Sequence, residues 1–285
     1  MNRPDRSRPG GHRPPGSRPS GHRMRVMTSA APSTPPPELG KLFRVAGLPA
    51  VRALFSRDPG RVERLYYEDR VKTGAGEFCR VMAAERKPYR LSDAAEMERI
   101  NGSVLHGGIL ALTRPKTVEA FDLESARRLA PGRKPILMLD GVGNPHNLGA
   151  IARTCAFFGI ETLVLSDHPE QAGPSEAAWR VAEGGLEYVT LSRAVRFAGL
   201  LKRMRPFYHV IGTALAPDAK NLSDVKMDNR PLAIVLGNEE SGLPAATLEA
   251  CESLVTIRGS GQIQSLNVSA TAAIVIHNIV RAQGP

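Results

Sequence analysis

The last segment of the chain restricts its possible folds more than any other. From Ile257 to Arg281 the sequence reads IRGSGQIQSLNVSATAAIVIHNIVR, so a loop rich in Gly, Ser and Gln leads directly into a long apolar helix. Glycine permits backbone conformations closed to other residues and lets a loop approach a bound group closely. Ser265 and Asn267 stand where the helix begins, and either could cap it by accepting a bond from a first-turn amide. The pattern fits a ligand-binding loop, or a capped helix alone.

Two upstream segments have the same character. In LDGVGNPHNLGAIARTCAFFGI, residues 139–160, an apolar run ends at Asp140 and Gly141, passes a Gly/Asn/Pro turn and continues with helical spacing. In LAIVLGNEESGLP, residues 232–244, five apolar residues end at Gly237 and a polar cluster follows. Each pattern predicts a strand that opens into a loop. Because open α/β sheets bind ligands in the loops after the carboxyl ends of parallel strands, three such loops predict one composite site.

At these residues the chain resembles the SpoU (TrmH-type, SPOUT class) family of RNA ribose 2′-O-methyltransferases. The resemblance covers roughly Pro135 to Arg281, and the three family motifs occur in the expected order. The motifs fall on Asn147 and Arg153, on Gly237, Asn238, Glu239 and Gly242, and on Ser265 to Ser269, which reads SLNVS. The resemblance implies an α/β fold with a parallel sheet whose C-terminal segment forms a deep trefoil knot, a rare exception to ordinary chain topology.

The resemblance also implies a cofactor and a site. The cofactor is S-adenosylmethionine, and no metal is expected. The catalytic residues that it implies are Arg153, Asn147, Glu239, Ser265 and Asn267. The cofactor-binding positions that it implies, mostly through backbone groups, are Thr213 or Gly212, Gly237, Ile257 and Leu266.

Individual roles in this site stay open. A guanidinium with a pKa above about 12 is a poor general base. Arg153 could therefore stabilise the developing alkoxide, grip the adjacent phosphate or still take the proton, and the sequence does not separate these roles. Glu239 could instead fix its loop through backbone amides.

A dinucleotide-binding oxidoreductase is the competing interpretation of the first motif. Gly141 and Gly143 precede a helix, as in the dinucleotide fingerprint. That fingerprint needs a third glycine three residues later, where this chain has His146. The oxidoreductase interpretation is therefore set aside.

Charge is distributed unevenly along the chain. Of the 38 basic and 28 acidic residues, residues 1–40 hold seven and two, and residues 41–115 hold fourteen and nine. From residue 116 onward there are seventeen of each, so the whole net charge of +10 lies in the first 115 residues. Such an excess attracts a polyanion such as RNA, although it could also be ordinary solvated surface charge.

Composition divides the chain into four parts. Residues 1–40 contain nine prolines and many Arg, Gly and Ser residues, which predicts a disordered basic tail without a secretory signal. Met24 and Met27 are alternative candidates for the first residue. Residues 41–115 are long enough for a small α/β domain, residues 116–134 are expected to be a linker or short helix, and residues 135–285 form the methyltransferase domain.

The small domain resembles the ribosomal-protein-like RNA-binding module that this family often carries. Its sequence predicts a helix over Leu48 to Phe55, a strand over Val62 to Tyr66 and a further strand at HGGILALT. Four side chains could contact RNA, although core packing accounts for each tyrosine equally well. These are Arg64, Tyr66, Tyr67 and Arg70.

The cysteines are consistent with a reduced, cytoplasmic protein. Cys79, Cys155 and Cys251 lie far apart and form no metal-ligand pattern. Cys155 falls on the apolar face of the motif helix, which predicts a core position. No apolar stretch is long enough for a membrane span, so no membrane partner is expected.

The sequence therefore predicts a methyltransferase that modifies a ribose 2′-hydroxyl of RNA, with rRNA preferred and tRNA as the alternative. The second functional hypothesis is a non-catalytic RNA-binding factor for ribosome assembly that has the same fold. A homodimer is expected from the family. The last helix offers small and apolar residues for its interface, at Ala270, Ala273, Ile274 and His277, although burial within one subunit explains them too.

Overall fold

The structure is a computed structural model that describes residues 42–216, 219–224 and 228–283. The predicted basic tail lies outside the described residues. Most of the chain, Glu38–Pro285, forms one compact unit, and it contains two β-sheets. No helix among the described residues is long and apolar enough to cross a membrane.

The first sheet has four strands in the order β1-β4-β2-β3, with β2 and β3 parallel and the other pairs antiparallel. Its strands are β1 (Phe43–Ala46), β2 (Val62–Tyr67), β3 (Tyr89–Leu91) and β4 (Ile109–Thr113). Its helices are α1 (Leu48–Arg57), α2 (Lys72–Ala84) and α3 (Ala94–Asn101), with 3₁₀ turns at Pro59–Arg61 and Asp69–Val71. The predicted helix and both predicted strands of this region are confirmed.

Aromatic packing joins the helices of this first sheet. Phe55 of α1 stacks on Phe78 of α2 with their ring centroids 4.7 Å apart. Tyr66 is buried, and the guanidinium of Arg90 lies 5.4 Å from the centre of its ring. Tyr66 therefore belongs to the core, which was one of the two alternatives for it.

The second sheet has eight strands, all parallel, in the order β10-β12-β9-β11-β6-β7-β8-β5. The strands are β5 (Glu119–Ala120), β6 (Ile136–Asp140), β7 (Thr162–Leu165), β8 (Thr190–Arg193), β9 (His209–Thr213), β10 (Lys220–Asn221), β11 (Leu232–Gly237) and β12 (Ser253–Thr256). Every residue of the central pair, β6 and β11, is buried. Parallel strands covered on both faces read as continuous apolar runs, which is why the sequence revealed them.

Helices cover both faces of the parallel sheet. They are α4 (Leu123–Leu129), α5 (Pro145–Phe158), α6 (Glu176–Ala182), α7 (Gly185–Tyr188), α8 (Phe197–Met204), α9 (Ala245–Ala250) and α10 (Val268–Gln283), with 3₁₀ turns at Ala130–Gly132 and Leu222–Asp224. Leu137 and Leu139 of β6 share a core with α5 and α10, whereas Ile136 and Met138 pack with α4 and α8. This alternation follows the two-residue period of a strand.

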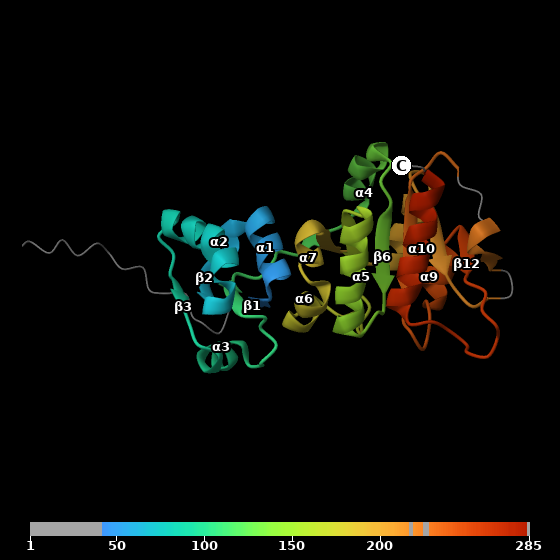
Figure 1. Cartoon of the computed structure of the whole chain (residues 1–285). Coiled ribbons are helices and arrows are strands. Elements are labelled where there is room, and N and C mark those ends of the chain that lie inside the picture. Colours follow the sequence, from blue (N-terminus) through green and yellow to red (C-terminus); the bar gives the residue numbers. More distant parts are fainter. Residues whose placement is uncertain (1–41, 217–218, 225–227, 284–285) are drawn as a thin grey trace, which may run out of the picture. The chain divides into compact units, whose positions relative to one another are not determined.

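The C-terminal segment crosses back over the sheet. β12 lies beside β9, on the side away from β11. The chain then returns so that α10 packs along α5 and also contacts β11 and the 3₁₀ turn Leu222–Asp224 (Figure 1). That turn belongs to the connection from β9 to β11, so the last helix lies against this connection. The predicted trefoil knot requires this arrangement.

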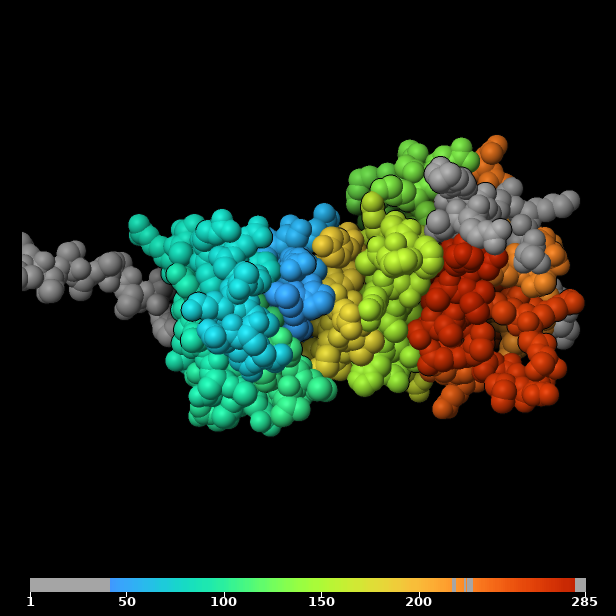
Figure 2. Space-filling model, viewed as in Figure 1, coloured from blue at the N-terminus to red at the C-terminus, as the bar shows by residue number. Residues whose placement is uncertain are grey.

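Buried and exposed polar contacts join the two sheets. Arg61, the last residue of the 3₁₀ turn before β2, donates from Nη2 to Oε1 of Glu187 in α7 at 2.7 Å, and the Glu187 side chain is only 1% exposed. The indole nitrogen of Trp179 in α6 donates to the same oxygen at 2.9 Å. The helix α1 packs directly on α7, where blue meets yellow in Figure 2. The two sheets therefore share a buried polar junction.

Candidate active site

Two of the three predicted loops, those after β11 and β12, line one pocket together with the loop after β9, and we call it the three-loop pocket. It encloses about 620 Å³ and is lined by residues 213–216 after β9, residues 237–243 after β11, and residues from Val255 to Val275 in β12, the following loop and α10. These loops leave the carboxyl ends of neighbouring parallel strands, where an open α/β sheet offers its crevice. The predicted loop after β6 does not line this pocket and the loop after β9 takes its place, so the composite site predicted from the sequence is present only in part.

The second loop is closed tightly on itself, and Gly237 makes this possible. A Cβ built at Gly237 would lie 2.5 Å from the carbonyl group of Gly242, closer than real Cβ contacts allow. Asn238 and Gly242 exchange backbone hydrogen bonds of 3.0 and 3.1 Å. The Asn238 side chain accepts bonds from the amides of Glu240 and Ser241. Only glycine at position 237 lets the loop fold this closely onto the end of β11.

Asn238 also connects the loop after β11 to the loop after β6. Its Nδ2 donates to the carbonyl oxygen of Gly141 at 2.9 Å. Gly141 follows β6 with φ of +84°, a left-handed conformation that favours glycine. One amide side chain therefore holds the ends of β6 and β11 in register at the edge of the sheet that carries the pocket.

A chain of three side chains crosses between the loops. Asn147, buried in the first turns of α5, donates from Nδ2 to Oε1 of Glu239. The Oδ1 of Asn147 accepts from Nδ2 of Asn267 at 3.1 Å. Asn267 in turn accepts at Oδ1 from the amide of Ser269, at 2.8 Å, and so caps α10. Asn267 therefore caps α10 and also contacts Asn147, although the sequence alone left capping and a place in the site as alternatives.

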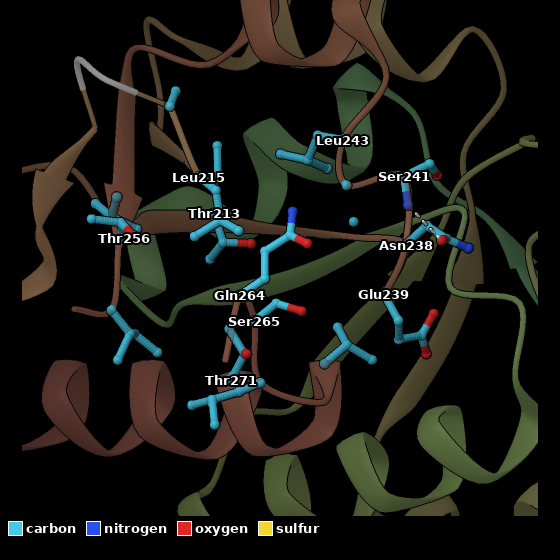
Figure 3. A pocket seen from close by; sticks show the side chains of 18 of the residues that line it. Thr213, Leu215, Asn238, Glu239, Ser241, Leu243, Thr256, Gln264, Ser265 and Thr271 are labelled. Atoms are coloured by element: carbon cyan, nitrogen blue, oxygen red, sulfur yellow. Dashed lines mark hydrogen bonds between the residues drawn. The ribbon is translucent and has the colours of Figure 1, made fainter. Parts of the chain in front are cut away.

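The third loop forms the mouth of the pocket. Ser265 and Leu266 line it, both exposed, and the side chain of Gln264 extends from this loop into the middle of the pocket (Figure 3). Six of the nine predicted site residues line the three-loop pocket. These are Thr213, Gly237, Glu239, Ile257, Ser265 and Leu266.

Arg153 lies elsewhere. It follows Asn147 by six residues in α5, and six residues rotate the side chain direction by about 240° around an α-helix. Within one chain it does not line the three-loop pocket; its Nη2 lies 2.9 Å from Oε2 of Glu183, at the end of α6. Both side chains are half exposed. The structure therefore brings Asn147, Glu239 and Asn267 together but places Arg153 in a different groove.

The sequence interpretation missed part of the lining. Val268, Thr271 and Val275 of α10 face the pocket, and their spacing of three and four residues could have identified this face. Leu215, after β9, and Thr256, at the end of β12, also line it. No local pattern marks these two, because only the sheet order brings β9 and β12 together.

The pocket has the character of a small-molecule site. Its volume falls within the roughly 300–1,000 Å³ usual for ligand pockets, and aliphatic side chains alternate with threonine hydroxyls and backbone groups. None of the described lining residues is cationic, whereas Glu239 and Glu240 are anionic. The negative potential of these carboxylates suits a cationic sulfonium compound such as S-adenosylmethionine. Among the described residues no cluster of His, Cys, Asp and Glu could hold a metal ion.

The parallel sheet, the helix that packs back across it and the three-loop pocket are the fold and site of a methyltransferase of the SPOUT class. The sequence model of the SpoU rRNA Methylase family matches residues 134–277, which is half of the chain. The chain belongs to this family.

Known relatives support the assignment. A 23S rRNA (guanosine-2′-O-)-methyltransferase RlmB from Burkholderia sp is 32% identical over 244 residues, covering 85% of this chain and 97% of the relative. An uncharacterized tRNA/rRNA methyltransferase YfiF from Escherichia coli O157:H7 is 31% identical over 236 residues, 82% of this chain, and the match spans 66% of YfiF. An rRNA methyltransferase structure from Sinorhizobium meliloti has the same fold, with a TM-score of 0.68 at 20% identity over 86% of this chain and 88% of that one.

Proposed function

We propose that this protein transfers a methyl group from S-adenosylmethionine to a ribose 2′-hydroxyl of ribosomal RNA. The observation that carries the proposal is the three-loop pocket with the Glu239–Asn147–Asn267 chain at its edge. The similarity to RlmB over nearly its whole length supports the choice of rRNA. The positive charge of residues 1–115 supports a polyanionic substrate.

S-adenosylmethionine supplies an electrophilic methyl group on a positively charged sulfur. The protein has to hold it, align the attacking hydroxyl and assist removal of the hydroxyl proton. The cofactor is bound by backbone groups of the three loops and by the hydroxyls of Thr213, Thr256 and Thr271. The carboxylate of Glu239 contributes negative potential near its sulfonium. The buried amide of Asn147 fixes the carboxylate of Glu239 on one side and Asn267 on the other. A site whose polar groups are already paired needs little reorganisation during the reaction.

Arg153 acts on the RNA in this proposal. A guanidinium is a poor general base, so we assign Arg153 the stabilisation of negative charge on the ribose oxygen or on an adjacent phosphate rather than removal of the proton. Its position outside the three-loop pocket supports a contact with RNA more than one with the methyl donor.

A homodimer belongs to the same proposal, as does a cytoplasmic location. On α10, Ala270 and His277 are exposed and Ile274 is half-buried. The ring of His277 contacts Phe158 of α5, and the adjacent Phe157 is 81% exposed. This apolar face of α5 and α10 is suited to a second copy of the chain. Sedimentation of wild type and Phe157→Glu tests it, and a monomeric wild type would refute the dimer.

The activity is tested with labelled S-adenosylmethionine and separate rRNA and tRNA pools from cells lacking the gene. We expect label in rRNA as a 2′-O-methylribose, and none with Arg153→Ala, which should still bind the cofactor. Label found only in tRNA would show that tRNA, the alternative substrate, is the one modified. Cofactor and RNA binding without transfer to any pool, including ribosome assembly intermediates, would favour the non-catalytic binding factor.

A further inference from the structure

A second groove surrounds Arg153, and the proposed function assigns no RNA contact to the other residues that line it. It encloses about 490 Å³ between α1, α5 and the corner joining α6 to α7, and we call it the Arg153 groove. Its charged residues are Arg52 of α1, Arg153 of α5 and Glu183 at the corner. Phe157 and Tyr188 are exposed aromatic residues on its walls.

The two arginines differ in their partners. Arg153 is paired with Glu183 at 2.9 Å. Arg52 is exposed and forms no ion pair or hydrogen bond with any described residue. A third cation, Arg57, lies over the ring of Tyr188, 5.6 Å from its centre. The groove therefore carries an excess of guanidinium groups, which bind phosphate oxygens in a fixed fork geometry.

The position of Glu183 is set by the packing of its neighbours. Its φ is +44°, an uncommon conformation for a residue with a side chain. A Cβ on Gly184 would lie 2.6 Å from Cβ of Ala53 in α1, and one on Gly185 would lie 2.7 Å from Cα of Arg153 in α5. The corner is thus wedged between α1 and α5, and it presents the carboxylate to Arg153 as a fixed feature.

The pair is nevertheless easy to exchange. The Arg153 and Glu183 side chains are 57% and 51% exposed, and ion pairs of this exposure are weak. A phosphodiester offers the same guanidinium a charged acceptor and brings Arg52 into the interaction as well. An anion that binds both arginines therefore competes well with one carboxylate that binds only Arg153.

We propose that the Arg153 groove binds a backbone phosphate of the RNA between Arg52 and Arg153, and that Glu183 occupies the guanidinium of Arg153 until this phosphate replaces it. The inference rests on the proposed RNA substrate and extends it. Glu183 is a built-in competitor for RNA, and release of Arg153 for the reaction is coupled to the arrival of the strand. The exposed ring of Tyr188 gives an unpaired base a surface for stacking.

The test compares binding of a fluorescent, mixed-sequence single-stranded RNA to wild type and Glu183→Gln at low salt. The glutamine keeps the shape of the side chain but loses the competing charge, so we expect a dissociation constant about two- to fivefold lower, the range set by weak exposed pairs. Glu161→Gln is the matched control, because Glu161 is 59% exposed and pairs with Lys134 elsewhere on the surface. It changes the net charge equally and should alter binding much less.

A double-mutant cycle shows whether the gain passes through Arg153. Arg153→Ala and the Arg153→Ala, Glu183→Gln double variant should bind the RNA equally, and Arg52→Ala should weaken binding. The inference is overturned if Glu183→Gln binds no tighter than wild type, if Glu161→Gln gains as much, or if the gain persists without Arg153. Equal melting temperatures exclude a folding defect as the cause.

The outcomes separate this inference from the proposed function. Methyl transfer by wild type, together with unchanged RNA binding by Glu183→Gln, would refute only the competitor role. RNA binding that depends on Arg52 and Glu183 in a protein that transfers no methyl group would refute the enzyme and leave the phosphate site in place.

Discussion

Among single residues, Asn147 is held from both ends of its side-chain amide. It is buried, and its amide donates to Glu239 and accepts from Asn267, so each end of the amide has one partner from a different loop. A carboxylate at this position would lose the donor, and an aliphatic side chain would lose both bonds. The amide is therefore what joins the second and third loops around the pocket.

Substitution of Asn267 should separate its two tasks. Asn267→Asp keeps an acceptor for the first turn of α10 but removes the donor to Asn147, so we expect near-normal stability and methyl transfer reduced about ten- to a hundredfold, the effect of an unpaired buried amide. Asn267→Ala loses the cap as well and should also unfold more easily, by about 1 kcal/mol. Urea unfolding and methyl transfer, measured on the same preparations, check both. Full activity in Asn267→Asp would contradict a role for the Asn147 bond.

The structure brings together only some of the site residues that the sequence grouped. Motif order placed Asn147, Glu239 and Asn267 in one site, and the structure brings them into direct contact. The same motif grouped Arg153 with them, but the rotation of α5 sends it to another groove. Its partner Glu183 is thirty residues away in the sequence, and no local pattern connects the two.

At the scale of elements, the loops after β11 and β12 differ in how tightly they are packed. Gly237 has no room for a Cβ, whereas a Cβ on Gly259, in the loop after β12, would meet no atom within 4 Å. Both glycines belong to motif loops, and only one is required by close approach. The two positions therefore form a natural pair for comparison.

We expect Gly237→Ala to displace the second loop, destabilise the protein by about 1–3 kcal/mol as overpacking does, and abolish cofactor binding. Gly259→Ala should leave stability within about 0.5 kcal/mol of wild type, as exposed substitutions usually do. Isothermal titration with S-adenosylmethionine and thermal unfolding measure the two effects. Equal cofactor affinity in both variants would show that the closed loop is unnecessary.

Elements with a long apolar run were predictable, and short ones were not. β6 and β11 are buried on both faces and carry unbroken apolar sequences, so both were found. β5 and β10 have two residues each and exist only because a parallel neighbour supplies their hydrogen bonds. The segment expected to be a linker or short helix, residues 116–134, contains β5 and α4, so part of it belongs to the large sheet.

For the whole molecule, the buried junction between the sheets should contribute much of the coupling between them. Glu187→Ala leaves Arg61 and the Trp179 indole without their shared acceptor, and removal of one partner of a buried ion pair typically costs about 3–5 kcal/mol. Glu176→Ala is the comparison, since Glu176 pairs with Arg44 where both side chains are far more exposed, and it should cost less than about 1 kcal/mol. Urea unfolding followed by circular dichroism distinguishes the two, and equal losses would contradict the importance of burial.

Alkaline pH should weaken the fold. Burial raises the pKa of Cys155 and of Cys251 from 9.0 to about 12, and that of Tyr208 from 10.0 to about 12. The folded protein therefore keeps protons that the unfolded chain has lost, so the free energy of unfolding falls as the pH rises from about 9 toward 12. Melting temperatures across this pH range measure the loss of stability, and the double variant Cys155→Ser, Cys251→Ser should lose less. A melting temperature independent of pH above 9 would show that these groups titrate as in the unfolded chain.

The chain has one tryptophan, and it lies at the junction. Trp179 donates to Glu187 and packs edge-on against Phe43 of β1, with ring centroids 5.6 Å apart. Tryptophan fluorescence of the unlabelled protein, excited where tyrosine does not absorb, therefore reports on this boundary. A red shift of its emission on addition of RNA would show water entering between the two sheets, and an unchanged spectrum would show that they bind as one body.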